Sequence, residues 1–311
     1  SNPLTRHSKF GGPAWEYVPC LGKWYLHLYD VMQADLNWEN PAVREEMADI
    51  LRFWKAKGIK GFRFDVINVI SKPEFYENDY EGDGRRFYTD GPNIHRYLQE
   101  LNEATFGTDA EIITVGEMSS TTMENCYQYA TENGKALSMV FSFHHLKVDF
   151  MGNEKWVIVP FDFLKLKNIL FDWQTHMAEH HAWNAVFWCN HDQPRVVSRF
   201  GNEKKYWKES AKMLAASIHC LRGTPYIYQG EELGMTNAGF TDISQYKDVE
   251  SLNHFRILQE KGLSQENAYQ ILQIHSRDNS RTPNAAENEC GILNAELKEG
   301  QTSPPKHFTE D

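Results

Sequence analysis

The sequence lacks the features that mark several large classes of protein. No stretch approaches 18 consecutive apolar residues, and the first residues, SNPLTRHSKFGG, contain no apolar core of a secretion signal. The five cysteines lie far apart and form no C-x-x-C pair, which argues against a disulfide framework and a zinc ribbon. Neither a G-x-G-x-x-G nor a P-loop pattern occurs, so no nucleotide cofactor is predicted. We expect a soluble protein without a membrane span, in a reducing compartment such as the cytoplasm.

Positive charge is also scarce. Lys and Arg together number 32 against 43 Asp and Glu, a formal net charge of -11, which disfavours nucleic acid or an anionic membrane as the main partner. An anionic ligand would therefore need a local basic pocket. With 41% hydrophobic and 24% charged residues in 311, the chain can bury a sizeable core in one large domain or two small ones.

Hydrophobic periodicity alternates between helix and strand along the middle of the chain. Residues 41–58 place apolar side chains at helical spacing after a predicted N-cap, Asn40, and the run IKGFRFDV (59–66) then alternates apolar and polar residues as a strand does. Further strands are predicted at 112–117, 137–144, 185–192 and 225–229, and further helices at 93–106, 122–129, 163–177 and 208–221. Strands that alternate with helices predict an α/β fold with a parallel sheet.

Composition divides the chain into three stretches. Residues 1–40 are rich in Gly, Pro and Trp and are predicted to be irregular. Residues 41–283 carry the predicted strands and helices. Residues 284–311 are polar and almost without aromatic side chains, so we expect a loose C-terminal tail there.

Three predicted strands end in carboxylates, at Asp65, Glu117 and Asp192. In a parallel α/β barrel such strand ends gather at the face that carries the active site. Two neighbouring carboxylates suit cleavage of a glycosidic bond, because one can stay protonated as an acid while the other stays ionised as a nucleophile. Arg63 could keep Asp65 ionised. Taken singly, each Asp could instead cap a helix, and Arg63 with Asp65 could form a plain salt bridge.

Four segments resemble signature regions of the α-amylase family of retaining glycoside hydrolases: QADLNWEN (33–40), GFRFDVIN (61–68), VGEM (115–118) and CNHDQPR (189–195). The resemblance implies a partial (β/α)8 TIM barrel, roughly strands four to eight with their helices, preceded by a remnant of an inserted irregular domain. It implies Asp65 as nucleophile, Glu117 as general acid/base and Asp192 as the carboxylate that grips sugar hydroxyls. Arg63, His191 and Arg281 are implied to bind substrate, and Arg281 is expected to lack the aspartate with which the family pairs it.

Within this family, GDGRRFYTDGP (82–92) and FSFHHLKVDF (141–150) are similar to the branch that hydrolyses trehalose 6-phosphate. A cationic cluster at the pocket mouth would suit one phosphorylated sugar, and the candidate phosphate-binding residues are His144, His145, Lys147 and Lys155. The alternative is that the two histidines pack or cap while Lys147 is solvated. Zinc binding by the histidine pair is disfavoured, since no third ligand occurs at a metal-like spacing.

The resemblance implies an enzyme without a cofactor that converts trehalose 6-phosphate into glucose and glucose 6-phosphate with retention. An oligo-1,6-glucosidase-type α-glucosidase is one alternative, and a non-catalytic sugar-binding or interaction fragment is another. Members of the family begin with three βα units and end with a β domain that this sequence does not contain. An incomplete barrel exposes strand edges and apolar core, which is costly unless a second chain covers it. We therefore expect weak or absent activity from this chain alone.

One acidic segment imitates a calcium-binding loop. Asp79, Glu81, Asp83, Gly84 and Asp90 fall at spacings like those of an EF-hand. Glu81 and Asp90 depart from the usual ligand choices, and no helices flank the segment convincingly. No metal site is predicted.

Overall fold

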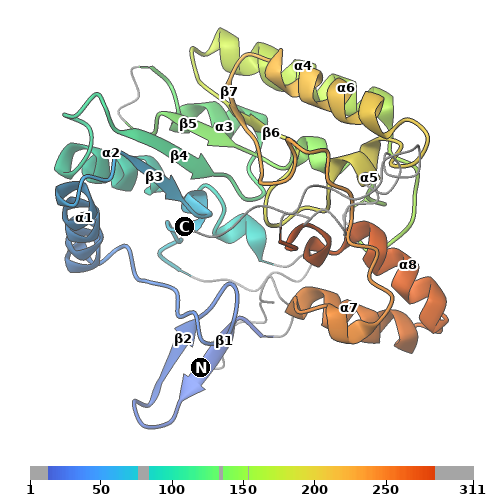
Figure 1. Ribbon diagram of the computed structural model, residues 1–311. Coiled ribbons are helices and arrows are strands. Elements are labelled where there is room, and N and C mark those ends of the chain that lie inside the picture. The colour runs from blue at the N-terminus through green and yellow to red at the C-terminus, as the bar shows by residue number, and fades with distance from the viewer. Residues whose placement is uncertain (1–12, 76–83, 133–135, 153, 284–311) are drawn as a thin grey trace, which may run out of the picture. The chain divides into compact units, whose positions relative to one another are not determined.

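The computed structural model describes residues 13–75, 84–132, 136–152 and 154–283 (Figure 1). The chain divides into two compact units. Unit 1 comprises Ser1–Val148, Asp162–Val186 and Leu221–Pro225, and unit 2 comprises Asp149–Phe161, Phe187–Cys220 and Tyr226–Asp311. Each unit is described by itself.

Unit 1 is built on a parallel sheet. Its strands lie in the order β3 (Gly61–Phe64), β4 (Ile113–Glu117) and β5 (Met139–Phe141). Next along the chain, β6 (Ala185–Phe187) pairs with β7 (Thr224–Tyr226), and Asn184, just before β6, forms a parallel bridge with Val140 of β5. The sequence prediction of parallel strands is confirmed for β3, β4 and β5.

Helices alternate with the parallel strands in unit 1, as the sequence pattern predicts. They are α1 (Pro41–Ala56), α2 (Ile94–Ala104), α3 (Met123–Cys126) and α4 (Phe163–Glu179). The side chain of Asn40 accepts a hydrogen bond from the backbone N–H of Ala42 at 3.0 Å, which satisfies a donor that the first turn of α1 leaves open. Short 3₁₀ helices occupy strand-to-helix connections at Ile67–Val69, Arg85–Phe87 and His144–Leu146, and another, Tyr127–Tyr129, lies between α3 and β5.

The main core of unit 1 joins this sheet to its helices. Its buried residues include Ala48 of α1, Leu98 of α2, Val140 of β5 and Met177 of α4. Gly116 of β4 lies in the same packing: a Cβ at this position would come 2.5 Å from Leu137 Cδ1, so a larger residue would have to displace the Leu137 side chain. This packing fixes the end of β4, where Glu117 lies.

The stretch predicted to be irregular contains a hairpin. Strands β1 (Trp15–Val18) and β2 (Lys23–Leu26) pair antiparallel, and Gly22 adopts a left-handed φ of 61° in the turn between them. A small core forms beside the hairpin, with Leu28, Val69 and Tyr88 buried in it. The strands have only four residues each, and this length is too short for period-2 alternation to stand out from the surrounding Gly and Pro.

Unit 2 is mainly helical in its described part. Its helices are α5 (Val196–Phe200), α6 (Trp207–His219), α7 (Val249–Glu260) and α8 (Gln265–His275), with 3₁₀ helices at Ile243–Gln245 and Arg277–Ser280. The sequence predicts α6 but not α7 and α8. Those two pack on a core that includes Trp156, Tyr246 and Phe255.

Several sequence predictions concern residues outside the described part. These are the tail 284–311, Cys290, and Asp79, Glu81 and Asp83 of the calcium-loop imitation. In the part that is described, Cys20, Cys126, Cys189 and Cys220 are free thiols. No helix among the described residues combines the length and the apolar character that crossing a bilayer requires.

Candidate active site

Unit 1 brings three predicted site residues together. Arg63 and Glu117 project from the adjacent parallel strands β3 and β4, and Asp65 directly follows β3. Arg63 Nη1 lies 2.9 Å from Asp65 Oδ1, and Arg63 Nη2 donates to Glu117 Oε2. The guanidinium also lies over the ring of Phe141, 5.8 Å from its centroid. One planar cation therefore bridges both carboxylates.

The two bridged carboxylates lie in different environments. Glu117 is 6% exposed, whereas the side chain of Asp65 is 70% exposed. Unlike surroundings are what allow two neighbouring carboxyl groups to take different roles in one reaction. This arrangement is compatible with one carboxyl group acting as a general acid/base and the other as a nucleophile.

Tyr29 is a neighbour of this group that the sequence does not reveal. Burial raises the pKa of its hydroxyl, and the negative charges of Glu117 and Asp65 raise it further, so Tyr29 stays a neutral phenol at physiological pH. It belongs to the stretch predicted to be irregular, where no periodic pattern marks a residue as facing a site. A neutral hydroxyl beside two carboxylates can donate a hydrogen bond to substrate or to a carboxylate oxygen.

The segment QADLNWEN has a structural role in unit 1. Asp35 forms an ion pair with Lys72, whose Nζ lies 2.8 Å from Asp35 Oδ1, and Lys72 also donates to the backbone carbonyl of Val69. Burial raises the pKa of Asp35 and lowers that of Lys72, while their pairing opposes both shifts. The pair ties this segment to the chain that follows β3.

Unit 2 gathers positive charge around Asp192. Arg277 Nη1 and Arg281 Nη2 both donate to Asp192 Oδ1, at 2.7 and 3.0 Å, and His191 Nε2 lies 3.2 Å from Oδ2. Arg277 Nη2 also donates to Asp248 Oδ1 at 2.7 Å, and Asp248 is buried. Asp192 is thereby held by fixed partners.

Two arginines pair with Asp192, and the sequence pointed to one of them, Arg281. Its Nε also donates to the backbone carbonyl of His191 at 2.7 Å. Asp192 is not the aspartate with which the family pairs Arg281, so the expectation that this other partner is lacking stays a prediction. Arg277 was not among the candidates, although it lies in the same segment, SRDNSRTP. Its acidic partner Asp192 lies 85 residues away in sequence, a separation that no local pattern encodes.

The candidate phosphate-binding residues fall in both units. In unit 1, His144 and His145 belong to the 3₁₀ helix that follows β5, and Lys147 comes directly after it. Burial, with Lys147 nearby, lowers the pKa of His144 to about 4, so this imidazole is neutral at pH 7. Burial and the charge of Arg85 lower the pKa of Lys147. Lys147 is the ammonium group of this turn, and Arg85 is a charged neighbour.

Lys155 belongs to unit 2 and has other partners there. Its Nζ lies 3.0 Å from Glu250 Oε2 and 4.7 Å from the centroid of the Trp156 ring. A phosphate at Lys155 would have to compete with the Glu250 carboxylate.

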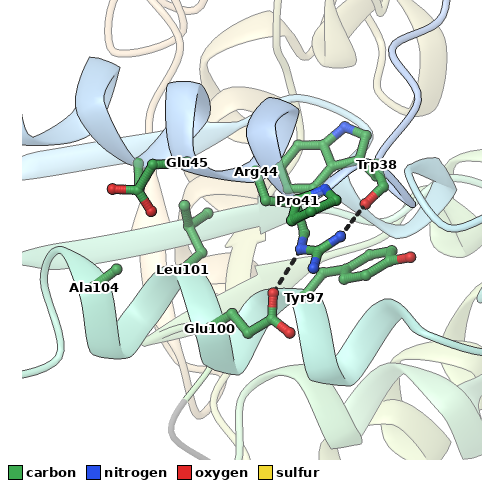
Figure 2. Close-up of a pocket in the computed structure, with 9 residues that line it drawn as sticks. Trp38, Pro41, Arg44, Glu45, Tyr97, Glu100, Leu101 and Ala104 are labelled. Atoms are coloured by element: carbon green, nitrogen blue, oxygen red, sulfur yellow. Dashed lines mark hydrogen bonds and ion pairs between the residues drawn. The ribbon is translucent and has the colours of Figure 1, made fainter.

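A cavity of about 250 Å³ lies between α1 and α2 in unit 1 and is lined by none of the predicted site residues (Figure 2). The Arg44 side chain points between Trp38 and Glu100 there, donating to the Trp38 carbonyl at 2.7 Å and to Glu100 Oε2 at 2.6 Å. Its guanidinium also covers the Tyr97 ring, 4.9 Å from the centroid. The polar groups of Arg44 are satisfied within the protein, which leaves this cavity little to offer a ligand.

Comparisons with known proteins agree with the chemistry of the site. The family model described as the alpha amylase catalytic domain matches residues 1–297. The trehalose-6-phosphate hydrolase of Bacillus subtilis is 60% identical over 283 residues, and the oligo-1,6-glucosidase of Bacillus cereus is 48% identical over 287 residues. The crystal structure of Bacillus licheniformis trehalose-6-phosphate hydrolase superimposes with a TM-score of 0.86 at 59% identity.

These matches cover nearly all of this chain but only part of each relative. The alignments include 91%, 90% and 91% of this chain, and 50%, 51% and 51% of the B. subtilis, B. cereus and B. licheniformis proteins respectively. The chain thus spans about half the length of the relatives it matches.

Proposed function

Because the chain belongs to the α-amylase family, we propose that it carries the catalytic carboxylates of a retaining glycoside hydrolase that converts trehalose 6-phosphate into glucose and glucose 6-phosphate. The observation that carries this proposal is the single guanidinium of Arg63 bridging Asp65 and Glu117. Retaining enzymes hold their two carboxyl groups roughly 5–5.5 Å apart, and a planar cation that contacts both keeps them at short range.

The family also accounts for the fold. Its catalytic domain is a (β/α)8 barrel, and the chain provides part of such a barrel, as the sequence predicts. Functional groups of this fold lie at the carboxyl ends of the strands. Asp65 and Glu117 occupy such positions, directly after β3 and at the last residue of β4.

In the first proposed step, a carboxylate oxygen of Asp65 attacks the anomeric carbon of the non-phosphorylated glucose. Glu117 gives its proton to the departing glycosidic oxygen, so that glucose 6-phosphate leaves as an alcohol and a glucosyl ester of Asp65 forms. The exposed position of Asp65 leaves its carboxylate open to the sugar. Arg63 partners both carboxylates and would stabilise the negative charge on whichever is ionised.

In the second step, Glu117 takes a proton from water as the water oxygen attacks the same carbon. The ester bond breaks, glucose leaves with its original anomeric configuration, and Asp65 returns as a carboxylate. Asp192 would grip sugar hydroxyls, with His191, Arg277 and Arg281 holding its carboxylate in place.

Two observations favour trehalose 6-phosphate over a neutral isomaltose-type sugar. Identity to the B. subtilis trehalose-6-phosphate hydrolase, 60%, exceeds identity to the B. cereus oligo-1,6-glucosidase, 48%. Lys147 supplies a half-buried ammonium group that a neutral sugar does not need. We propose His144 and His145 as hydrogen-bonding groups of the same subsite, and Lys155 as a further cation that exchanges Glu250 for phosphate.

The proposed substrate is a soluble sugar phosphate, and we propose the cytoplasm as its compartment. Since the relatives are about twice as long, we also propose that activity requires further polypeptide, either from the same protein or from a second chain. A non-catalytic sugar-binding role would leave the bridged carboxylates without a use.

The test is release of glucose 6-phosphate from trehalose 6-phosphate. It is made with this chain alone and with a full-length chimera, in which the chain replaces the 283 residues that it matches in the B. subtilis protein. We expect activity from the chimera, little from the chain alone, and a loss of about 10³-fold or more in kcat for a Glu117→Gln chimera. Isomaltose is the control substrate. A folded chimera that is inactive, or that prefers isomaltose, would overturn the assignment.

A further inference from the structure

Strained backbone gathers beside the catalytic carboxylates of unit 1. Among the described residues, Val66, Asp90, Ser120 and His181 are the non-glycine residues with positive φ. Val66, with φ 38°, directly follows Asp65, and Ser120, with φ 56°, comes three residues after Glu117. A left-handed backbone is unfavourable for a β-branched residue such as Val66, so surrounding contacts must hold it.

A buried amide joins the segment that contains Val66 to the segment that contains Ser120. Asn68 is 0% exposed and lies three residues after Asp65. Its Nδ2 donates to the carbonyl of Ser119 at 2.9 Å, and its Oδ1 accepts the backbone N–H of Ser119 at 2.8 Å. This pair of hydrogen bonds joins the segment that follows Asp65 to the segment that follows Glu117, as backbone hydrogen bonds join neighbouring strands.

The third strained residue completes the connection. Asp90, with φ 51°, accepts from Asn68 Nδ2 at 3.0 Å and from Tyr129 Oη at 2.6 Å on Oδ1. Its Oδ2 accepts from Thr121 Oγ1 at 2.7 Å and from Asn125 Nδ2 at 3.2 Å. The backbone N–H of Asp90 also donates to the carbonyl of Asn68 at 2.9 Å.

We infer that Asn68 and Asp90 are positioning residues that fix the general acid Glu117 relative to the nucleophile Asp65 through the backbone of Ser119. The inference rests on the proposed function. Neither side chain needs to touch substrate. Because retaining chemistry depends on the separation of the two carboxyl groups, a shift of about 1 Å in one loop can cost about 100-fold in rate.

The test compares two substrates on the full-length chimera. Trehalose 6-phosphate has a poor leaving group that needs protonation by Glu117, whereas 4-nitrophenyl α-glucoside has a good one that needs little. For Asn68→Ala we expect kcat on trehalose 6-phosphate to fall about tenfold or more, kcat on the aryl glucoside to fall at least about three times less, and both KM values to change less than about threefold.

Asn125→Ala is the matched control. It also removes one amide hydrogen bond from Asp90, but it does not join the two strand-end segments, so we expect nearly unchanged kcat on both substrates. Asp90→Asn keeps the side-chain shape and carries the test if Asn68→Ala does not fold. Equal losses on both substrates, or equal effects of Asn68→Ala and Asn125→Ala, would overturn the inference. An unsubstituted chimera inactive on both substrates would instead overturn the proposed function.

Discussion

At the level of single residues, we propose that Lys147 distinguishes trehalose 6-phosphate from a neutral sugar. Burial and Arg85 both lower the pKa of its ammonium group, so an anion placed there would relieve repulsion as well as gain a charge-assisted hydrogen bond. We predict that Lys147→Ala raises KM for trehalose 6-phosphate about tenfold or more in the chimera, since hydrogen bonds to charged groups contribute about 1.5–3 kcal/mol. Initial-rate kinetics on trehalose 6-phosphate and on the neutral 4-nitrophenyl α-glucoside measure this effect.

The control for Lys147 is Lys165→Ala, which removes the same charge from an exposed position on α4. We expect Lys165→Ala to leave KM unchanged for both trehalose 6-phosphate and 4-nitrophenyl α-glucoside. We expect Lys147→Ala to leave KM for 4-nitrophenyl α-glucoside unchanged. An equal rise in KM for the neutral aryl glucoside would mean that Lys147 supports the fold rather than the phosphate.

His275 links stability to pH. It is 2% exposed, its Nε2 lies 2.6 Å from the Val157 carbonyl, and burial lowers its pKa from 6.5 to about 4. Between these values the unfolded chain binds a proton that the folded chain does not, so stability is full above pH 6.5 and is lost as pH falls toward 4. The shift corresponds to an effect of about 3 kcal/mol.

We predict that His275→Gln, which keeps an N–H donor but cannot titrate, flattens the fall in Tm between pH 6.5 and pH 4. Thermal unfolding of the chain and of the variant across this range measures it. Parallel curves for the two proteins would show that other groups cause the acid sensitivity.

At the level of elements, hydrophobic periodicity predicts the helices and strands that are determined by their own side-chain pattern. The spacing of Val43, Met47 and Trp54 locates α1, and the alternation of Phe62 and Phe64 with Arg63 and Asp65 locates β3. The run from residue 137 to 144 predicts a longer strand than β5, which has three residues. Phe143 extends the apolar pattern past Phe141, but the 3₁₀ helix His144–Leu146 begins directly after it.

What the pattern missed depends on contacts between distant segments. In α7 a buried serine, Ser251, faces the same interior as Phe255 and Leu258, which weakens the apolar period. That serine is satisfied by the hydroxyl of Ser276 at 2.7 Å, a partner 25 residues away. Asp65 and Glu117 could be predicted because β3 and β4 place them, whereas β6 ends at Phe187, five residues before Asp192. Arg277 and Asn68 find their partners 85 and 51 residues away. Periodicity carries no information at that range.

At the level of the whole molecule, an apolar face and an open strand edge mark where further polypeptide should pack. Ile50, Phe53 and Trp54 of α1 are exposed, and β3 is the edge strand of its sheet in the described structure. Exposed apolar clusters and unpaired strand edges are costly in water, so we expect the free chain to bind a complementary surface. The half of the relatives that this chain does not match is the natural candidate.

We therefore predict that this chain co-purifies with the separately expressed remainder of the B. subtilis protein and that the pair releases glucose 6-phosphate faster than the chain alone. Ile50→Asp combined with Phe53→Asp should weaken the association about tenfold or more, because two charges would be buried against an apolar surface. Phe171→Asp, at an exposed position on α4, is the control and should leave it intact. Size-exclusion chromatography and activity of the mixture measure both effects. Association that survives the α1 substitutions would place the contact elsewhere.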